Sequence, residues 1–288
     1  MLLGPLRPKD LYCDKFWNRT TCSMNFAASG DYRGDGRALQ HAIIMQHIDK
    51  LTFRPGDEVF DVGCGSGEET KTIASKVKGV VGIDSSEAMI AVANQSNSAP
   101  NIEYVVEDAR SVGDNPKWRG KFDKVVSFFM LHWIPTEEQP SALGGILSCL
   151  MAGGEALFLI NTKDKGPHDL SASVLFLKNH PKWGVYAKHY ELPLYIWKRS
   201  IPDTVKLLKT FGCTVLEGQI KRQEFALSEV QVKLIWKTIL KVADLVPAEK
   251  QDEFLEDIWQ WALSRSADET KSQYLNVNET VVIHVRKE

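Results

Sequence analysis

The segment E-V-F-D-V-G-C-G-S-G, residues 58–67, joins an apolar strand to three glycines and an immediate helix start. Gly63, Gly65 and Gly67 let the backbone turn tightly and come close to a ligand, because glycine has no Cβ. The first N–H groups of the next helix have no partner within that helix and attract polar or anionic groups. The segment therefore predicts a binding turn for a nucleotide-derived ligand.

The spacing of these glycines separates two classes of nucleotide ligand. Dinucleotide folds use G-x-G-x-x-G, whereas this chain has G-x-G-x-G with Asp61 two residues before it. The next helix begins with Glu68 and Glu69, whose carboxylates would repel a pyrophosphate but suit a cationic sulfonium and an ammonium group. The pattern favours S-adenosylmethionine over NAD.

Two further acidic residues end the strands that follow. Asp84 ends V-V-G-I-D and is expected to accept hydrogen bonds from both ribose hydroxyls. Asp108, in V-V-E-D-A-R, is expected to accept from the adenine amino group. Either acid alone is also explained as a turn cap, but three successive strands ending in this way favour a cofactor site. The predicted cofactor-binding residues are Asp61, Gly63, Cys64, Gly65, Gly67, Asp84, Ser85, Asp108, Ala109 and Phe128.

Short apolar strands alternate with helices between residues 37 and 160. This alternation predicts an α/β fold with a doubly wound, mostly parallel sheet that is covered on both faces. Two long strands later in the chain flank a helical insertion and suggest an antiparallel pair at one edge. The predicted strands are 58–62, 80–84, 102–106, 124–130, 155–160, 213–225 and 280–286, and the predicted helices are 37–50, 68–76, 87–95, 140–150, 203–211 and two within 228–264 that separate at Pro247.

The chain is long enough for one large domain that carries a cap. Residues 1–30 are predicted to be a flexible extension, because the start of the chain has no helical or strand period. Residues 31–288 are predicted to form a single domain. The segments 163–200 and 228–264 break the strand–helix rhythm and are rich in aromatic residues, so we expect them to form a cap over the ligand-binding edge of the sheet.

Composition restricts the partners and the compartment. The 288 residues carry a formal net charge of −2 and no dense run of Lys and Arg, so neither nucleic acid nor a membrane surface is an expected partner. No apolar run reaches the length of a bilayer span. The five cysteines are scattered and form no C-x-x-C pair, which predicts reduced thiols, a cytoplasmic protein and no metal site.

Four motifs together resemble the class I S-adenosylmethionine-dependent methyltransferases, namely D-V-G-C-G-S-G, G-I-D, E-D-A and F-D-K-V-V-S-F-F-M-L-H-W. A narrower resemblance is to the juvenile hormone acid and farnesoic acid O-methyltransferases of arthropods. It rests on Leu39-Gln40, L-H-W at 131–133, P-K-W-G-V-Y at 181–186, V-P-A-E-K-Q-D-E-F-L-E-D at 246–257 and the closing V-V-I-H-V-R-K. Trans-aconitate methyltransferases have a similar L-H-W. The resemblance implies the class I methyltransferase fold and methylation of a small-molecule carboxylic acid of isoprenoid type.

The L-H-W tripeptide follows the predicted strand 124–130 and is expected beside the acceptor, since ligands of open α/β sheets lie at the carboxyl ends of the strands. A carboxylic acid is ionised at neutral pH and needs no general base, so neutral donors are enough to orient it. The resemblance points to Gln40 and Trp133 as these contacts. His132 is the third predicted catalytic residue, as a donor or as a base for a hydroxyl acceptor, with a structural histidine as the alternative.

Trp183 and Tyr186 are the predicted substrate residues, because their segment shares the resemblance and aromatic side chains can wall an apolar pocket. The alternative is that the cap aromatics form the core of the cap. Other functions stay open: methylation of a small polar acid of the trans-aconitate type or of a hydroxyl, and non-catalytic binding of S-adenosylmethionine. A homodimer is left open as well.

Overall fold

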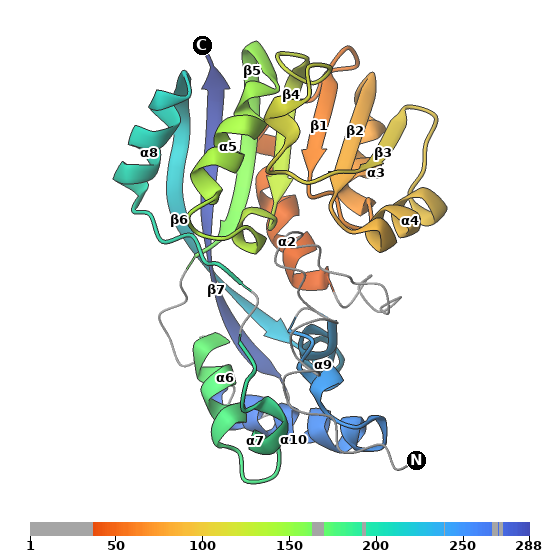
Figure 1. Ribbon diagram of the computed structural model, residues 1–288, viewed down its shortest axis with the longest axis vertical. Helices are drawn as coiled ribbons and strands as arrows, with labels where there is room; N and C mark the ends of the chain where they lie inside the picture. Colours follow the sequence, from red (N-terminus) through yellow and green to blue (C-terminus); the bar gives the residue numbers. More distant parts are fainter. Residues whose placement is uncertain (1–36, 163–169, 192–193, 239, 267–269, 271–272) are drawn as a thin grey trace, which may run out of the picture.

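The computed structural model describes residues 37–162, 170–191, 194–238, 240–266, 270 and 273–288, so the predicted extension 1–30 lies outside the described residues. A seven-stranded sheet with the order β3-β2-β1-β4-β5-β7-β6 forms its centre (Figure 1). The first five strands pair in parallel, and β7 runs antiparallel to β5 and β6. The mostly parallel sheet with an antiparallel edge pair is therefore confirmed. Its strands are β1 (Glu58–Val62), β2 (Gly79–Asp84), β3 (Ile102–Val106), β4 (Phe122–Phe128), β5 (Leu150–Asn161), β6 (Cys213–Leu227) and β7 (Tyr274–Lys287).

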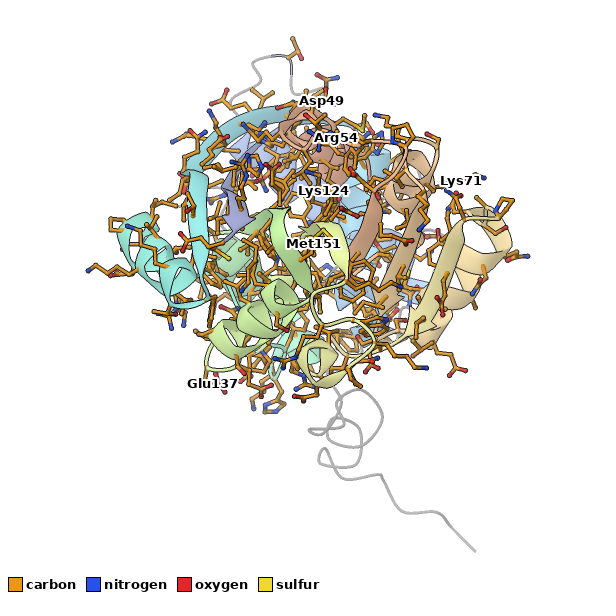
Figure 2. All side chains as sticks on the ribbon, turned by 90° about the horizontal axis from the view of Figure 1, so that it is seen from above. Asp49, Arg54, Lys71, Lys124, Glu137 and Met151 are labelled. Atoms are coloured by element: carbon orange, nitrogen blue, oxygen red, sulfur yellow. The ribbon has the colours of Figure 1, made fainter. Side chains whose placement is uncertain are left out.

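Because they are parallel, the first five strands all begin at one side of the sheet and all finish at the other, and the two sides differ. Figure 2 looks onto the edge where these strands begin, with Lys124 near the start of β4 and Met151 near the start of β5. The carboxyl ends lie at the opposite edge, toward α2 (Ala38–His47) and the cap (Figure 1). Among the described residues, no helix is long and apolar enough to cross a membrane.

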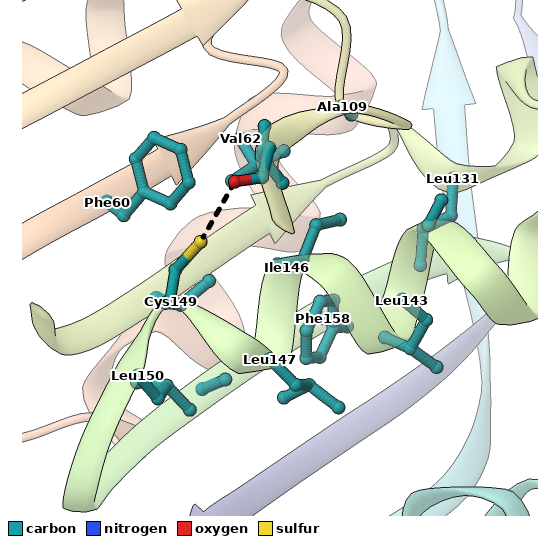
Figure 3. Close-up of a cluster of buried hydrophobic side chains, with 14 of the residues drawn as sticks. Phe60, Val62, Ala109, Leu131, Leu143, Ile146, Leu147, Cys149, Leu150 and Phe158 are labelled. Carbon is teal, nitrogen blue, oxygen red and sulfur yellow. Dashed lines mark hydrogen bonds between the residues drawn. The ribbon is translucent and has the colours of Figure 1, made fainter. Parts of the chain in front are cut away.

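Helices pack on both faces of the sheet, and each face has its own core. Neighbouring residues of β4 show the division, since Val125 belongs to one core and Val126 to the other, as the alternation of side chains along a strand requires. Part of the first core is drawn in Figure 3, where Leu143, Ile146 and Leu147 pack toward Phe158 of β5. The helices outside the cap are α2, α3 (Glu68–Ala74), α4 (Glu87–Ser96), α5 (Gln139–Ser148) and α8 (Ile201–Thr210).

The cap is a separate layer with a third core. It contains α6 (Leu170–Asn179), α7 (Gly184–Ala187), α9 (Glu229–Thr238) and α10 (Gln251–Arg265), and α9 and α10 separate around Pro247 as predicted. β6 and β7 extend past the other strands and stay paired as far as Leu227 and Tyr274, which both belong to the cap core. The antiparallel pair of β6 and β7 therefore joins the cap to the sheet (Figure 1).

Several strand boundaries differ from the prediction: β5 begins at Leu150 rather than at residue 155, and smaller shifts affect β2 and β6, while those of β4 and β7 have clear causes. β4 ends at Phe128 rather than at residue 130, because Phe129 has a φ of +56°, and Leu131–Trp133 form a short 3-10 helix instead. A non-glycine residue in the left-handed region cannot continue a strand. β7 begins at Tyr274, six residues before the predicted start at 280, because it pairs with β6 over its whole length.

Candidate functional site

A cleft lies at the carboxyl ends of β1, β2 and β4 and encloses about 1060 Å³ of space, including its open mouth. It brings together eleven of the residues selected from the sequence: Gln40, Asp61, Gly63, Cys64, Gly65, Asp84, Ser85, Asp108, Ala109, Phe128 and Trp133. Four others do not line it: Gly67, His132, Trp183 and Tyr186. The residues that line the cleft come from sequence positions 37 to 134, so the fold gathers separate motifs at one edge.

The glycine turn needs glycine for different reasons at its three positions. All three have positive φ, at +83° for Gly63, +53° for Gly65 and +82° for Gly67. A Cβ on Gly63 would collide with the Met130 side chain, and one on Gly67 would collide with Tyr104. A Cβ on Gly65 would meet nothing within 4 Å, so this residue faces the open cleft. Gly65 is therefore available for close approach of a ligand, whereas Gly67 packs behind the turn.

Asp84 closes the turn from the end of β2. Its two carboxylate oxygens accept from the backbone N–H groups of Gly65 (3.0 Å) and Ser86 (2.8 Å). Burial raises the pKa of Asp84 against the lowering effect of these two hydrogen bonds. The carboxylate keeps lone pairs that point into the cleft region, which suits a diol ligand.

Asp61 lies at the base of the cleft and is only 3% exposed. Thr70 of α3 donates its hydroxyl to this carboxylate at 2.6 Å. Burial raises the pKa of Asp61 to about 7, although the Thr70 hydrogen bond acts in the opposite direction. Asp61 thus gains or loses a proton near neutral pH, and a cation bound in the cleft would favour its ionised form.

Arg37 is a cleft residue that the sequence analysis missed. Its guanidinium contacts Glu68 at 2.9 Å and Glu69 at 2.6 Å, so the two carboxylates at the start of α3 are not left as bare negative charges. Of the two, only Glu69 lines the cleft. The signal in the sequence was the spacing of Arg37 three residues before Gln40, which places both on one face of a helix.

Arg110 is the second missed residue, and it changes the surroundings of Asp108. The Arg110 side chain contacts both oxygens of Asp108 at 2.5 to 3.0 Å, and a further guanidinium nitrogen contacts Glu138 at 2.9 Å. Burial would raise the pKa of Asp108, but the bonds from Arg110 outweigh burial and lower it. Asp108 therefore lies in the cleft as an ionised acceptor that is already shared with Arg110.

The cleft also has apolar and neutral polar lining residues. Ile44, Phe128 and Phe129 line it together with the amide of Gln40 and the indole of Trp133. The Oε1 atom of Gln40 is buried and has no hydrogen-bond partner among the described residues. Because the two ends of an amide exchange by a half-turn, this position suits a ligand that either donates or accepts.

His132 lies behind the cleft rather than in it. The residue is 3% exposed, and its Nδ1 has no partner in the described part of the chain. Burial lowers the pKa of its imidazole to about 3, so the ring is neutral and a weak base at physiological pH. Its carbonyl accepts from the backbone N–H of Tyr195 at 2.7 Å, which ties the L-H-W turn to the segment after α7.

Trp183 and Tyr186 belong to the cap core and are not brought into the cleft. Trp183 is fully buried, donates its indole N–H to Asp257 at 2.7 Å and packs edge-on against Phe254. Tyr186 packs at the margin of the same core. The alternative interpretation, that the cap needs a core of its own, describes where both side chains lie.

Comparison with known proteins identifies the domain. The methyltransferase domain family matches residues 59–154. Protein 235L of Invertebrate iridescent virus 6 is 30% identical over 179 residues, which are 62% of this chain and 59% of that protein, so the chain spans less than two thirds of its length. The juvenile hormone acid O-methyltransferase of Bombyx mori is 27% identical over 74% of this chain and 77% of the relative. A solved structure from Bacillus halodurans C-125 superposes with a TM-score of 0.56 at 20% identity, over 85% of this chain and 99% of that chain.

The cleft fits the cofactor of this domain family. Gly65 offers backbone that a ligand can approach closely, Asp84 offers acceptors for a diol, and Asp61 with Glu69 offers negative charge for cationic groups. Among the described residues, no group of His, Cys, Asp and Glu is arranged to hold a metal ion. The chain therefore contains a class I S-adenosylmethionine-dependent methyltransferase domain, and it resembles the juvenile hormone acid O-methyltransferases.

Proposed function

We propose that the protein methylates the carboxylate of an apolar small-molecule acid, of the juvenile hormone acid or farnesoic acid type. The observation that carries this proposal is that apolar side chains, among them Ile44, Phe128 and Phe129, line the cleft together with the neutral donors of Gln40 and Trp133. The Bombyx mori relative aligns with most of this chain, and its name supports a substrate acid of the same class.

Neutral donors are suited to this reaction. The Gln40 amide and the Trp133 indole N–H can each hydrogen-bond a carboxylate oxygen without neutralising its charge. A cationic clamp would stabilise the ground-state charge that is used in the attack. Holding the acceptor oxygen in line with the methyl group supplies most of the catalysis in a displacement of this kind.

The charges of the cleft favour a monoacid over a polyacid. Two guanidinium groups line it in the described part of the chain, and both already contact carboxylates: Arg37 contacts Glu68 and Glu69, and Arg110 contacts Asp108. Within the cap, Lys182 pairs with Glu253 and lies over Trp183. A polar acid of the trans-aconitate type would need cations that these pairs do not offer.

The protonation state of His132 favours an acid over a hydroxyl. A hydroxyl acceptor has to lose its proton to a base, whereas His132 is neutral with a pKa near 3 and does not line the cleft. Bound S-adenosylmethionine supplies an electrophilic methyl group. A carboxylate acceptor already carries the electron pair that would take up this methyl group, so Gln40 and Trp133 would need only to orient it and no residue would have to accept a proton.

Labelled S-adenosylmethionine and a panel of acceptors test the proposal. The panel contains farnesoic acid, juvenile hormone acid, a saturated fatty acid, trans-aconitate and a phenol. We expect an extractable labelled methyl ester from the terpenoid acids. Label on trans-aconitate or the phenol instead would contradict the acceptor assignment, and cofactor binding without label on any acceptor would favour a non-catalytic binder.

A pair of variants tests the contact to the carboxylate. Trp133→Phe keeps an aromatic side chain, although a smaller one, and removes the indole N–H, so we expect turnover of the terpenoid acid to fall about tenfold, the loss typical of one hydrogen bond to a charged group. Affinity for S-adenosylhomocysteine should stay unchanged. Trp261→Phe, in the cap and outside the cleft, is the matched control. Equal losses of turnover and cofactor affinity in Trp133→Phe would make Trp133 a structural residue.

A further inference from the structure

Arg37, the residue just before α2, and Gln40, His41 and Ile44 of α2 follow the i, i+3, i+4, i+7 spacing of a helix face. Arg37, Gln40 and Ile44 line the cleft, whereas His41 does not and is half-exposed. Arg37 and His41 lie on either side of Gln40 in the sequence, and both contact the same residue of another helix.

That partner is Glu69, the second residue of α3, directly after the glycine turn. Arg37 Nη2 contacts Glu69 Oε2 at 2.6 Å, and His41 Nδ1 contacts Glu69 Oε1 at 3.0 Å, so each carboxylate oxygen has its own partner. Glu69 is 5% exposed. Burial would raise the pKa of Glu69, but Arg37 and His41 together lower it, so the carboxylate stays ionised.

The apolar side of α2 holds the helix on the sheet without setting the direction of Gln40. Ile43, Ile44 and Ile48 are buried in the same core as Val126 and Phe128 of β4. Apolar packing of this kind is not directional, so it tolerates a small rotation of the helix. Two hydrogen bonds to one carboxylate, from residues on both sides of Gln40, remove that freedom.

We propose that Glu69 is a positioning residue which, held by Arg37 and His41, fixes the rotation of α2 so that the Gln40 amide meets the acceptor carboxylate. The inference rests on the proposed function for the role of Gln40. It connects the two halves of the site, because the helix that follows the cofactor turn also orients the residue that contacts the acceptor.

His41→Ala is the cleanest test, since His41 does not line the cleft and its half-exposed side chain can be removed without opening a cavity in the core. We expect the KM for the terpenoid acid to rise about two- to fivefold, the range of a partly exposed ion pair. The dissociation constant of S-adenosylhomocysteine, measured by calorimetry, should change less than twofold. His41→Gln keeps a donor for Glu69 and should restore the KM, and His189→Ala, an exposed histidine of the cap, is the matched control.

A double variant asks whether His41 acts through Glu69. Because both changes remove the same contact, Glu69→Ala with His41→Ala should raise the KM no further than Glu69→Ala alone. Additive effects would overturn the proposal. So would a His41→Ala protein with the wild-type KM, or one in which the KM and the cofactor affinity weaken equally.

Hydrogen exchange separates this inference from the proposed function, because it needs no acceptor. With S-adenosylhomocysteine bound, amides in Ala38–His47 should exchange faster in His41→Ala than in the wild type, and His41→Gln should return them to the wild-type rate. Unchanged exchange would overturn the proposal that Glu69, held by Arg37 and His41, fixes the rotation of α2. If exchange changes as expected but the wild-type protein methylates no acid, the proposed acceptor fails while the link between α2 and Glu69 stands.

Discussion

Glu155 and Asp61 are two largely buried carboxylates of one sheet, and their surroundings are opposite. Glu155 of β5 pairs with Lys124, which lies near the start of β4 in Figure 2, and its carboxylate contacts Lys124, His284 and Arg286. Burial would raise its pKa, but these partners lower it to about 2. Asp61 lies at the edge where the parallel strands end, and burial raises its pKa to about 7.

The difference shows which edge is built for stability and which for binding. A buried carboxylate that is surrounded by cations is already satisfied and has little left for a ligand. A buried carboxylate with a raised pKa is under-satisfied, and such groups gather at functional sites. Asp61 and Asp84, whose pKa values burial raises, are both at the cleft, whereas Asp244 of the cap is a further described acid with a raised pKa and lies outside it. A substitution at one of these edges should therefore change cofactor affinity or stability there and leave the property of the other edge as it is in the wild type.

Gly63→Ala should produce the largest effect, because it adds a Cβ against Met130 at a residue with φ +83°. The turn must shift, and we expect affinity for S-adenosylhomocysteine to fall at least about a hundredfold, as strain of this size implies. Calorimetry measures this affinity. Gly56→Ala, where a Cβ meets nothing within 4 Å, should bind normally. Normal binding by Gly63→Ala would mean that the turn does not shape the cofactor site.

Glu155→Gln should affect the opposite edge alone. Removing the carboxylate leaves Lys124 and Arg286 without their shared partner, so we expect the free energy of unfolding to fall by about 1–3 kcal/mol. Cofactor affinity should be preserved. Urea titration measures the stability, and Glu103→Gln, an exposed residue of β3, is the control. A loss of cofactor affinity as large as the loss of stability would refute the separation of the two edges.

The pH dependence of this stability has a definite sign. The folded pKa of Glu155 is about 2 against an ordinary value of 4.5, so the unfolded chain binds the proton first as the pH falls. Its contribution is complete above about pH 4.5 and disappears as the pH falls toward 2. The difference in stability between wild type and Glu155→Gln should therefore shrink between pH 5 and pH 3, and a constant difference would contradict the assigned pKa.

Asp61 predicts a pH dependence of binding at the other edge. Its carboxyl has a pKa of about 7 and loses its proton as the pH rises through neutrality. The cationic cofactor should therefore bind up to about tenfold more tightly at pH 8 than at pH 6, the change expected from ionising one partner near a cation. S-adenosylhomocysteine, which lacks the sulfonium charge, should show less change. Asp61→Asn should remove the difference, and if it persists the titrating group is another residue.

The sequence was enough to predict the sheet and the cofactor edge, because both depend on local patterns. Gly63, Gly65 and Asp84 lie at strand ends, and the alternation of strands and helices determines that those ends meet. The long pairing of β6 with β7 was less visible. The first six residues of β7, Y-L-N-V-N-E at 274–279, include two asparagines and a glutamate, which are depleted in strands, and their pairing with β6 makes them a strand.

The predicted residues that do not line the cleft, and the arginines that were not predicted, show what local patterns cannot indicate. Trp183 and Tyr186 have the side chains of a pocket wall, but the packing of four cap helices decides that they form a core. His132 follows a strand that ends at Phe128, two residues before the predicted end, because the left-handed backbone of Phe129 turns the chain. Arg37 and Arg110 were missed because their partners, the carboxylates of Glu69 and Asp108, are recognisable only once the helices and loops are placed.

Arg110→Ala should give the smallest effect at the cofactor edge. The residue bridges Asp108 and Glu138 and is about a quarter exposed, so solvent screens part of the interaction. Without the side chain, Asp108 keeps the hydrogen bond from the backbone N–H of residue 110 but loses the guanidinium that neutralises it. We expect affinity for S-adenosylhomocysteine to weaken about three- to tenfold, with a similar loss for adenosine alone, because Asp108 is the residue predicted to accept from adenine. Arg119→Ala, an exposed arginine outside the cleft that hydrogen-bonds the carbonyl of Gly113, should bind both ligands normally. Tighter binding by Arg110→Ala would show instead that the guanidinium competes with adenine for Asp108, and would reverse its role from support to barrier.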